Sequence, residues 1–290
     1  MYTTLIDVPQ LQALRHSGQP HRVFDCSFEL MHSAAGDQQY AQSHIAGAVR
    51  ADLERHLSAG KTAADAASGG RHPLPSRDSF ARWLGSVGFR NEMQAVVYDR
   101  HGNNYCGRLW WMLKWVGHEA VAVLDGGLQA WQAGGGELQA GTEADKAPPA
   151  SAARYTVAAP RAVLMTTDSV VKQLGRPAQN LIDARGELRF KGEVEPLDPV
   201  AGHIPGALNR PFSLNFDSDG KFKRADQLRA EFDALLAGRD PASVVHHCGS
   251  GVSAVPNIIA MELAGLGRTA LYAGSWSEWC SDSSRPVAQS

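Results

Sequence analysis

Short runs of β-branched and apolar residues alternate along the chain with longer stretches in which apolar residues recur at helical spacing. In the second half, 180–183 and 243–246 have the composition of buried strands, and 224–237 has the period of a helix. Strands that alternate with helices are typical of doubly wound α/β domains, in which helices flank a mainly parallel sheet. The pattern predicts the α/β class for both halves.

The chain also contains an internal repeat. Three motifs occur in each half in the same order, with offsets of 158 at the aspartates (183 minus 25), 159 at the histidines (203 minus 44) and 148 at the tryptophans (279 minus 131). The pairs are Val-Phe-Asp-Cys at 23–26 with Leu-Ile-Asp-Ala at 181–184, His-Ile-Ala-Gly-Ala at 44–48 with His-Ile-Pro-Gly-Ala at 203–207, and Leu-Asp-Gly-Gly-Leu-Gln-Ala-Trp at 124–131 with Tyr-Ala-Gly-Ser-Trp-Ser-Glu-Trp at 272–279. We therefore expect two tandem domains of one fold.

The boundary between these domains is expected near the middle of the chain. Residues 136–160 are rich in Gly, Ala and Pro and have no apolar periodicity, which indicates a linker. The predicted domains are 1–135 and 161–290. A length of 290 residues agrees with two domains, because one hydrophobic core rarely grows to that size.

Composition and charge narrow the class of function. The chain is 43% apolar and 20% charged, as expected for a soluble globular protein. Its formal charge of −2 gives no electrostatic reason to expect nucleic acid or a membrane surface as partner. The N-terminus lacks the basic start and apolar run of a secretory signal, so we expect a cytoplasmic protein. In that compartment the four cysteines are expected to be free thiols.

Cys248 opens a loop of small residues between an expected strand and an expected helix, within 242–254. Small residues allow the backbone to curl around the sulfur, so that its N–H groups form an anion-binding nest, and the helix adds the positive end of its dipole. Both effects favour thiolate, and lowering a pKa of ~8.5 by about two units would make most of the cysteine reactive at pH 7. The alternative is a buried small hydrophobic residue.

This loop resembles the active-site loop of the rhodanese and mercaptopyruvate sulfurtransferase family, and the resemblance covers 23–279. The motifs that carry it are His-Ile-Ala-Gly-Ala at 44–48, Gly-Arg-His-Pro-Leu-Pro at 70–75, Leu-Asp-Gly-Gly at 124–127, His-Ile-Pro-Gly-Ala at 203–207 and Cys-Gly-Ser-Gly-Val-Ser-Ala at 248–254.

The resemblance implies two rhodanese-type domains and a sulfurtransferase activity. Cys248 would take sulfur from a small donor, hold it as a persulfide and pass it to cyanide or to a thiol, including that of a thioredoxin-like protein. The donor is expected to be 3-mercaptopyruvate; the alternatives are a thiosulfate:cyanide sulfurtransferase and a sulfur-carrier protein. The resemblance implies neither a metal nor an organic cofactor.

The choice of donor rests on the residues that follow the cysteine. The thiosulfate branch of the family has Arg and Lys there, whereas Gly249 and Ser250 are neutral and suit a singly charged keto acid. The loop residues Gly249, Gly251, Val252 and Ser253 are expected to bind the substrate.

An arginine of the family that holds the anionic donor corresponds to Arg189, while Arg185 is expected to tie the loop to the sheet. The mercaptopyruvate branch often has a second arginine where this chain has Leu197. Either Arg71 or Lys191 replaces it, or donor binding is weaker.

His72 and Glu54 match positions that line up with Ser250 in the mercaptopyruvate branch. A carboxylate that orients His72 toward Ser250 would form a proton relay for the departing enolate. Because the family residue at position 54 is usually aspartate, Asp52 is a rival to Glu54. The alternative for His72 is a surface histidine beside a proline turn.

The first domain is expected to be non-catalytic. The position that corresponds to Cys248 is Arg100, and Cys106 is expected to serve in packing. His246 and His247 point to opposite faces of a strand, so a metal site with Cys248 is not expected, although one of them could stabilise the thiolate. A phosphatase is a weak alternative, because it needs an arginine at position 254, which is alanine.

Overall fold

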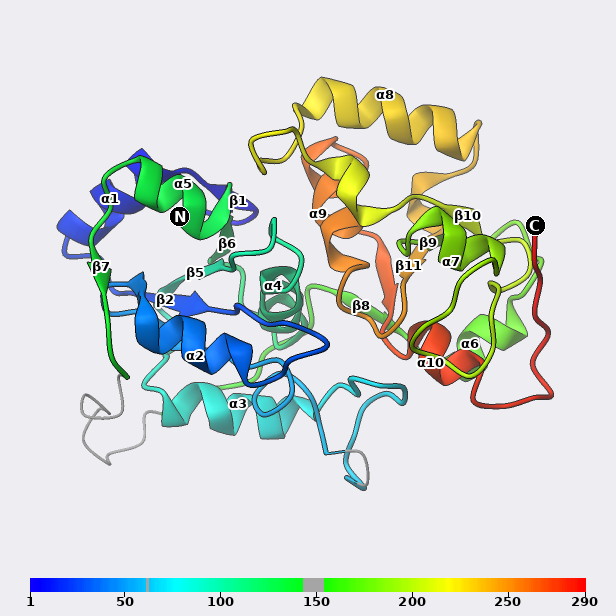
Figure 1. The fold of residues 1–290 in the computed structure, drawn as a ribbon, viewed down its shortest axis with the longest axis horizontal. Coiled ribbons are helices and arrows are strands. Elements are labelled where there is room, and N and C mark those ends of the chain that lie inside the picture. Colours follow the sequence, from blue (N-terminus) through cyan, green and yellow to red (C-terminus); the bar gives the residue numbers. More distant parts are fainter. Residues whose placement is uncertain (61–62, 143–153) are drawn as a thin grey trace. The chain divides into compact units, whose positions relative to one another are not determined.

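The computed structural model describes residues 1–60, 63–142 and 154–290 (Figure 1). The chain forms two compact units. The first consists of Met1–Gly60, Pro75–Arg161 and Ser218–Lys221, and the second of Lys61–Leu74, Ala162–Asp217 and Phe222–Ser290. Of the predicted linker, 143–153 lie outside the described residues, and 154–160 belong to the first unit, where the Tyr155 ring stacks on Phe89.

The first unit contains a parallel five-stranded sheet with helices around it. In spatial order its strands are β1 (Leu5–Ile6), β6 (Val121–Leu124), β5 (Gln94–Tyr98), β2 (His21–Asp25) and β4 (Val49–Arg50). Its helices are α1 (Val8–His16), α2 (Ala35–Gln42), α3 (Arg77–Ser86), α4 (Cys106–Trp115) and α5 (Gly127–Ala133). A small antiparallel pair joins β3 (His44–Ile45) and β7 (Leu138–Gln139).

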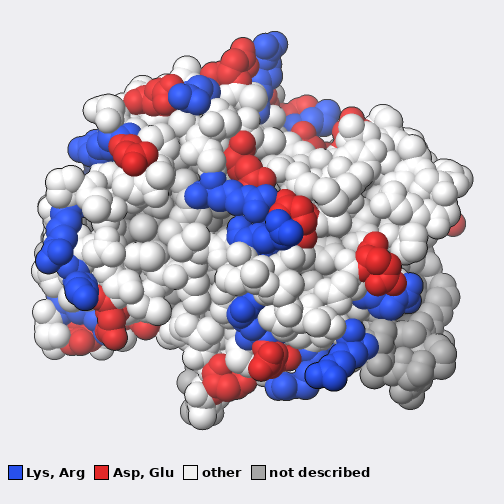
Figure 2. All heavy atoms as spheres, turned by 180° about the vertical axis from the view of Figure 1, so that it is seen from behind, with Lys and Arg blue, Asp and Glu red and all other residues white. Residues whose placement is uncertain are grey.

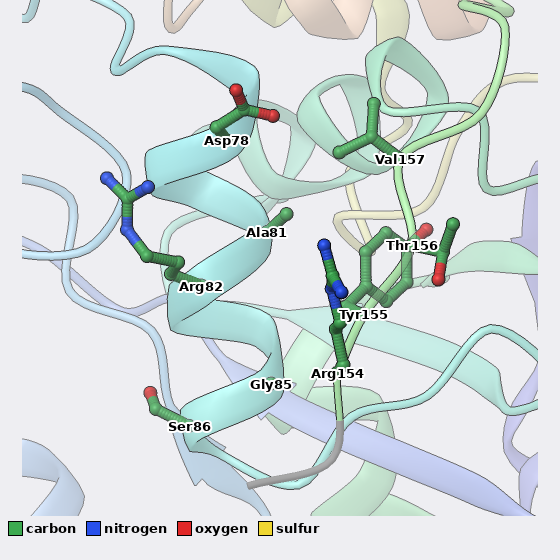
Figure 3. Close-up of a pocket in the computed structure, with 9 residues that line it drawn as sticks. All are labelled: Asp78, Ala81, Arg82, Gly85, Ser86, Arg154, Tyr155, Thr156 and Val157. Atoms are coloured by element: carbon green, nitrogen blue, oxygen red, sulfur yellow. The ribbon is translucent and has the colours of Figure 1, made fainter.

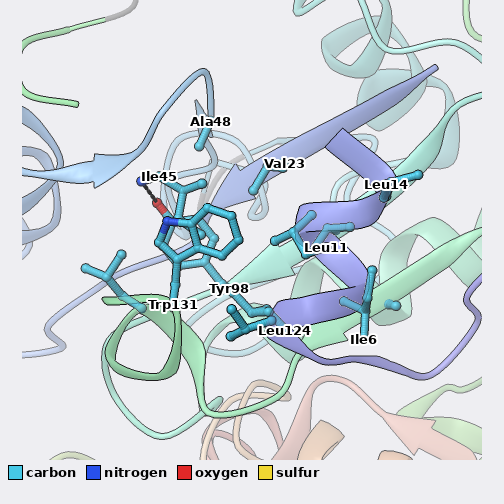
Figure 4. Close-up of a cluster of buried hydrophobic side chains, with 13 residues drawn as sticks. Ile6, Leu11, Leu14, Val23, Ile45, Ala48, Tyr98, Leu124 and Trp131 are labelled. Atoms are coloured by element: carbon cyan, nitrogen blue, oxygen red, sulfur yellow. Dashed lines mark hydrogen bonds between the residues drawn. The ribbon is translucent and has the colours of Figure 1, made fainter. Parts of the chain in front are cut away.

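The core of this unit follows from the apolar pattern of these elements. Strand β5 is buried at every position, as expected for a central parallel strand covered on both faces. The Trp131 ring of α5 packs with Leu11 and Tyr98 in the cluster of Figure 4. The Tyr98 hydroxyl in this cluster is hydrogen bonded: it accepts from the Ile45 amide at 3.0 Å.

The second unit repeats this topology. Its parallel strands are, in spatial order, β10 (Leu208–Asn209), β9 (Asn180–Asp183), β11 (Val244–His247), β12 (Ala270–Tyr272) and β8 (Val163–Met165). Its helices are α6 (Thr167–Lys172), α7 (Glu187–Lys191), α8 (Ala225–Leu236), α9 (Val255–Leu263) and α10 (Ser275–Trp279), with 3₁₀ turns at Phe212–Asn215 and Pro241–Ser243.

The predicted elements and the predicted repeat are confirmed. The expected strand at 180–183 is β9, the one at 243–246 is β11 displaced by one residue, and the expected helix is α8. Read from β10 to β8, the sheet has the same order as the first sheet read from β4 to β1. The carboxyl ends of β9 and β11 meet at one edge, where ligands of such sheets bind.

The distribution of charged side chains and the length of apolar helices complete the description of the fold. Figure 2 shows Lys and Arg side chains next to Asp and Glu side chains over the visible face, without a large area of one sign. Among the described residues, no helix has the length and apolar character required to cross a bilayer.

Candidate active site

Cys248 follows the last residue of β11 and is buried. The start of α10 fixes its backbone: the Cys248 amide donates to the Ser275 hydroxyl at 3.1 Å, and the Cys248 carbonyl accepts from the Trp276 amide at 2.9 Å. The next carbonyl, that of Gly249, accepts from the Ser277 amide at 2.9 Å. The loop is therefore anchored at the edge of the sheet on the side of β12 and α10.

The loop has backbone donors without protein acceptors. Among the described residues, the amides of Gly249, Ser250, Val252 and Ser253 donate to no protein atom. Gly251 has a φ of +72°, and a Cβ there would overlap the Ala273 carbonyl, so the tight curl requires glycine. Successive amides of this kind are available to hold an anion.

A network of ion pairs surrounds the loop. Arg189 of α7 donates from Nη2 to Glu195 Oε1 at 2.6 Å and to Asp198 Oδ2 at 3.3 Å. Arg71 donates from Nη1 to Asp198 Oδ1 at 3.1 Å. The loop residues are neutral, as the sequence shows, but both guanidinium groups lie within van der Waals range of a Cβ built at Gly249.

Arg185 has the structural role that was predicted for it. Its guanidinium donates to Asp183 Oδ2 at 2.7 Å and to the Gly202 carbonyl at 2.7 Å, and it lies over the Trp276 ring. Burial lowers its pKa, but Asp183, Glu195 and Cys248 raise it, so that the pKa of Arg185 lies above its ordinary value. Arg185 is therefore a permanent cation near the cysteine.

His72 and Ser250 are brought together. His72 Nδ1 lies 2.8 Å from Ser250 Oγ, and both residues are buried. His72 can reach Ser250 because residues 61–74 belong to the second unit, although they come between elements of the first. A hydrogen bond between an imidazole and a hydroxyl can transfer a proton in either direction.

Glu54 belongs to the first unit, and its side chain is exposed. Asp52 in the same segment is buried and pairs with Arg50 Nη2 at 3.1 Å, while its carboxylate also accepts from the Arg55 amide. A relay from either carboxylate to His72 stays a prediction.

Both histidines before the cysteine are buried in the sheet. His246 Nε2 lies 3.2 Å from Met261 Sδ, and His247 Nδ1 lies 3.9 Å from Asp183 Oδ2. Burial lowers the pKa of His246 to about 3 and also lowers that of His247. Neither histidine therefore supplies a positive charge to the thiolate at neutral pH.

The corresponding loop of the first unit is filled by its own carboxylate. Asp99 Oδ1 accepts from the amides of His101 and Asn103 at 2.8 and 3.0 Å, and Oδ2 accepts from Tyr105 and Cys106 at 2.7 and 2.9 Å. Asp99 was not predicted as a functional residue, although it is an aspartate at the position that corresponds to His247.

The residue in the place of the nucleophile, Arg100, turns away from the loop of the first unit. It pairs with Asp25 at 3.1 Å and donates to the carbonyl of Ser43. Cys106 is fully buried, and burial raises its pKa well above the ordinary value, as expected for a packing cysteine.

The first unit also has a surface pocket of about 900 Å³ between α3 and residues 154–157 (Figure 3). Arg82 and Asp78 of α3 line one side, and Tyr155 and Thr156 line the other. None of the candidate residues lies in this pocket.

Comparisons with known proteins agree with the repeat. The model of the rhodanese-like domain matches residues 7–134 and 166–282. A probable 3-mercaptopyruvate sulfurtransferase of Pseudomonas aeruginosa is 44% identical over 98% of this chain and 97% of its own length. A putative thiosulfate sulfurtransferase of Mycobacterium tuberculosis is 37% identical, with 98% of this chain and 96% of the relative covered. The structure of 3-mercaptopyruvate sulfurtransferase from Leishmania major superposes with a TM-score of 0.79 at 30% identity, over 98% of this chain and 76% of that one.

Proposed function

Because this chain belongs to the rhodanese family and is a sulfurtransferase, we propose that Cys248 is its nucleophile and that 3-mercaptopyruvate is its sulfur donor. The observation that carries the proposal is the loop that Cys248 opens. Within the part of the chain that the structure describes, the amides of Gly249, Ser250, Val252 and Ser253 donate to no protein atom. Ser250 in the same loop is hydrogen bonded to His72.

The proposed reaction has two steps. In the first, the Cys248 thiolate attacks the donor sulfur, and the bond from that sulfur to carbon breaks. The electron pair of this bond stays on carbon as the enolate of pyruvate, which takes a proton through Ser250 and His72. In the second, a thiolate or cyanide attacks the outer sulfur of the persulfide, and Cys248 leaves as a thiolate.

The loop amides would stabilise the charged species of both steps. Thiolate, persulfide and the developing enolate are all anions, and backbone N–H groups held in place are suited to them. We assign substrate binding to Gly249, Val252 and Ser253 for this reason, and to Gly251 because its left-handed backbone gives the loop its curl. Glu54 is proposed as the carboxylate of the relay on the family resemblance alone.

We propose that the N-terminal domain, 1–135, is non-catalytic in the sense that it supplies no nucleophile, that 136–160 connects the domains and that the C-terminal domain, 161–290, carries the nucleophile. His72 lies within 1–135 in sequence but in a segment that belongs to the unit of Cys248. The amides that would bind an anion in the first domain are bonded to Asp99, and Arg100 stands in place of the nucleophile.

The nucleophile is tested by intact-mass measurement after incubation with 3-mercaptopyruvate. The wild-type protein should gain one sulfur atom, and Cys248→Ser should gain none. Cys280→Ser is the matched control, since Cys280 is another buried cysteine of the same unit and should leave the added sulfur in place. Sulfur that is still added to Cys248→Ser would contradict the assignment.

The donor and the acceptor are tested in the same preparation. We expect kcat/KM to be higher for 3-mercaptopyruvate than for thiosulfate, with a dithiol, cyanide or a thioredoxin-like protein as acceptor. A higher value for thiosulfate would favour the second candidate, a thiosulfate sulfurtransferase, which the name of the M. tuberculosis relative and the two guanidinium groups beside Gly249 support. Release of a single sulfur without turnover would indicate a sulfur carrier.

A further inference from the structure

We propose that Arg71 is the second cation that binds the donor's carboxylate. It takes the place of the arginine that the mercaptopyruvate branch often has where this chain has Leu197. This inference rests on the proposed function of the Cys248 loop. It assigns a donor-binding residue to a segment that precedes α3 in sequence but belongs to the second unit.

The backbone around Arg71 is fixed against α10. The Arg71 amide donates to Ser277 Oγ at 2.9 Å, and the Gly69 amide donates to Glu278 Oε2 at 3.1 Å. Gly70 has a φ of +87°, and a Cβ there would lie 2.6 Å from the Gly274 carbonyl oxygen. The two glycines therefore allow the segment to approach α10 closely and to carry Arg71 to the loop.

Protein oxygens accept hydrogen bonds from one edge of each guanidinium group, and N–H donors remain at another edge. Arg71 uses Nη1 for the Leu197 carbonyl and Asp198, and one hydrogen of Nη2 for Asp198. Arg189 uses Nε and Nη2 for Glu195 and Asp198. Among the described residues, no protein acceptor binds Arg189 Nη1, and one hydrogen of Arg71 Nη2 is also left. Carboxylates thus orient both side chains without saturating them.

The donors that are left lie beside Gly249. A Cβ built at this residue would be 3.1 Å from Arg71 Nη2 and 3.6 Å from Arg189 Nη1. The absence of a side chain at Gly249 therefore allows both cations to lie close to the loop, one residue from the nucleophile. A planar carboxylate can accept from two guanidinium groups at once.

Lys191, the other candidate for this role, is engaged elsewhere. Its Nζ pairs with Glu187 at 2.6 Å on α7, where the Glu187 side chain is exposed and that of Lys191 is partly exposed. We therefore assign the second cation to Arg71. Asp198, which both arginines share, is a positioning residue.

The test separates a role in binding from a role in structure. In Arg71→Ala, kcat/KM for 3-mercaptopyruvate should fall roughly ten- to a hundredfold, mostly through a higher KM, because the charge contact exists in ground and transition states. Arg71→Lys should recover part of this loss, since it keeps the charge but not the planar fork. Lys191→Ala should equal wild type.

A second readout needs no sulfur transfer. Iodoacetate and iodoacetamide both alkylate a thiolate with loss of iodide, but only iodoacetate carries a carboxylate. The two rate constants at Cys248 are measured by peptide mass spectrometry. The rate constant for iodoacetate divided by that for iodoacetamide should fall about threefold or more in Arg71→Ala and stay unchanged in Lys191→Ala.

The outcomes distinguish the inference from the proposed function. If the ratio is unchanged in Arg71→Ala, whether both rate constants stay the same or fall by the same factor, the role of Arg71 is overturned even if Cys248 accepts sulfur. If 3-mercaptopyruvate does not transfer sulfur to the wild-type protein, the proposed donor fails, and a lower ratio in Arg71→Ala would still establish a carboxylate site at Arg71.

Discussion

Arg189 is the cation of α7 that lies beside the Cys248 loop, and it is one-fifth exposed. We expect Arg189→Ala to raise KM for the donor and to lower kcat/KM by roughly ten- to a hundredfold, equal to about 1.5 to 3 kcal/mol for a charge-assisted pair. Steady-state kinetics with 3-mercaptopyruvate check this. Arg229→Ala is the matched control, because Arg229 pairs with Asp233 on the exposed side of α8. Equal kcat/KM in the Arg189 variant and this control would contradict donor binding.

The roles of some residues in the candidate site could be predicted from the sequence, and those of others could not. Cys248 could be singled out because its signal is local: a strand, a cysteine, small residues and a helix. The hydrogen bond between His72 and Ser250 joins residues 178 positions apart, so only the family resemblance indicated it. Asp99 was missed because its four hydrogen bonds depend on a backbone curl that composition does not reveal.

The loop between β11 and α9 depends on a left-handed glycine packed against β12. Gly251→Ala should lower the free energy of unfolding by about 3 kcal/mol or more and remove activity, because a left-handed alanine costs ~1 to 2 kcal/mol and the Cβ also overlaps the Ala273 carbonyl. Gly206→Ala separates the two effects, since Gly206 has a φ of +78° with no atom near the added Cβ. It should cost only about 1 kcal/mol and leave activity unchanged.

Urea denaturation and steady-state assays of both glycine variants check this prediction. Equal losses of stability in Gly251→Ala and Gly206→Ala would show that the contact with Ala273 does not constrain the loop.

At the level of elements, periodicity located β9, β11 and α8 to within one residue. It did not show that residues 61–74 belong to the second unit. Its described residues, 63–74, have no regular secondary structure, and their place is fixed by contacts such as that between Gly69 and Glu278, which lie 209 residues apart. Local patterns carry no information about such contacts.

Across the whole molecule, buried histidines make stability depend on pH. Burial lowers the pKa of His246 from 6.5 to about 3, so below pH 6.5 the unfolded chain binds a proton that the folded chain does not. The unfolded state is then favoured as the pH falls. At pH 5.5 this single group should reduce the free energy of unfolding by about 1.4 kcal/mol relative to pH 8.

Urea titrations at both pH values, followed by circular dichroism, check this expectation. His246→Leu should reduce the difference between the two pH values by about 1.4 kcal/mol. His32→Leu serves as the control, because the His32 side chain is 79% exposed, and the difference should equal that of wild type. A difference in His246→Leu that matches wild type would show that His246 is protonated in the folded state.

Asp99 gives the two halves of the duplicated fold different relations to anions in solution. The loop of the first unit carries its own carboxylate, so its amides are hydrogen bonded whatever the concentration of anions in solution. The loop of the second unit must obtain its anion from outside, and its stability rises by mass action with the concentration of what it binds. We therefore expect the stability of the second unit to rise with the logarithm of the concentration of the anion that it binds, while that of the first unit does not respond to this anion.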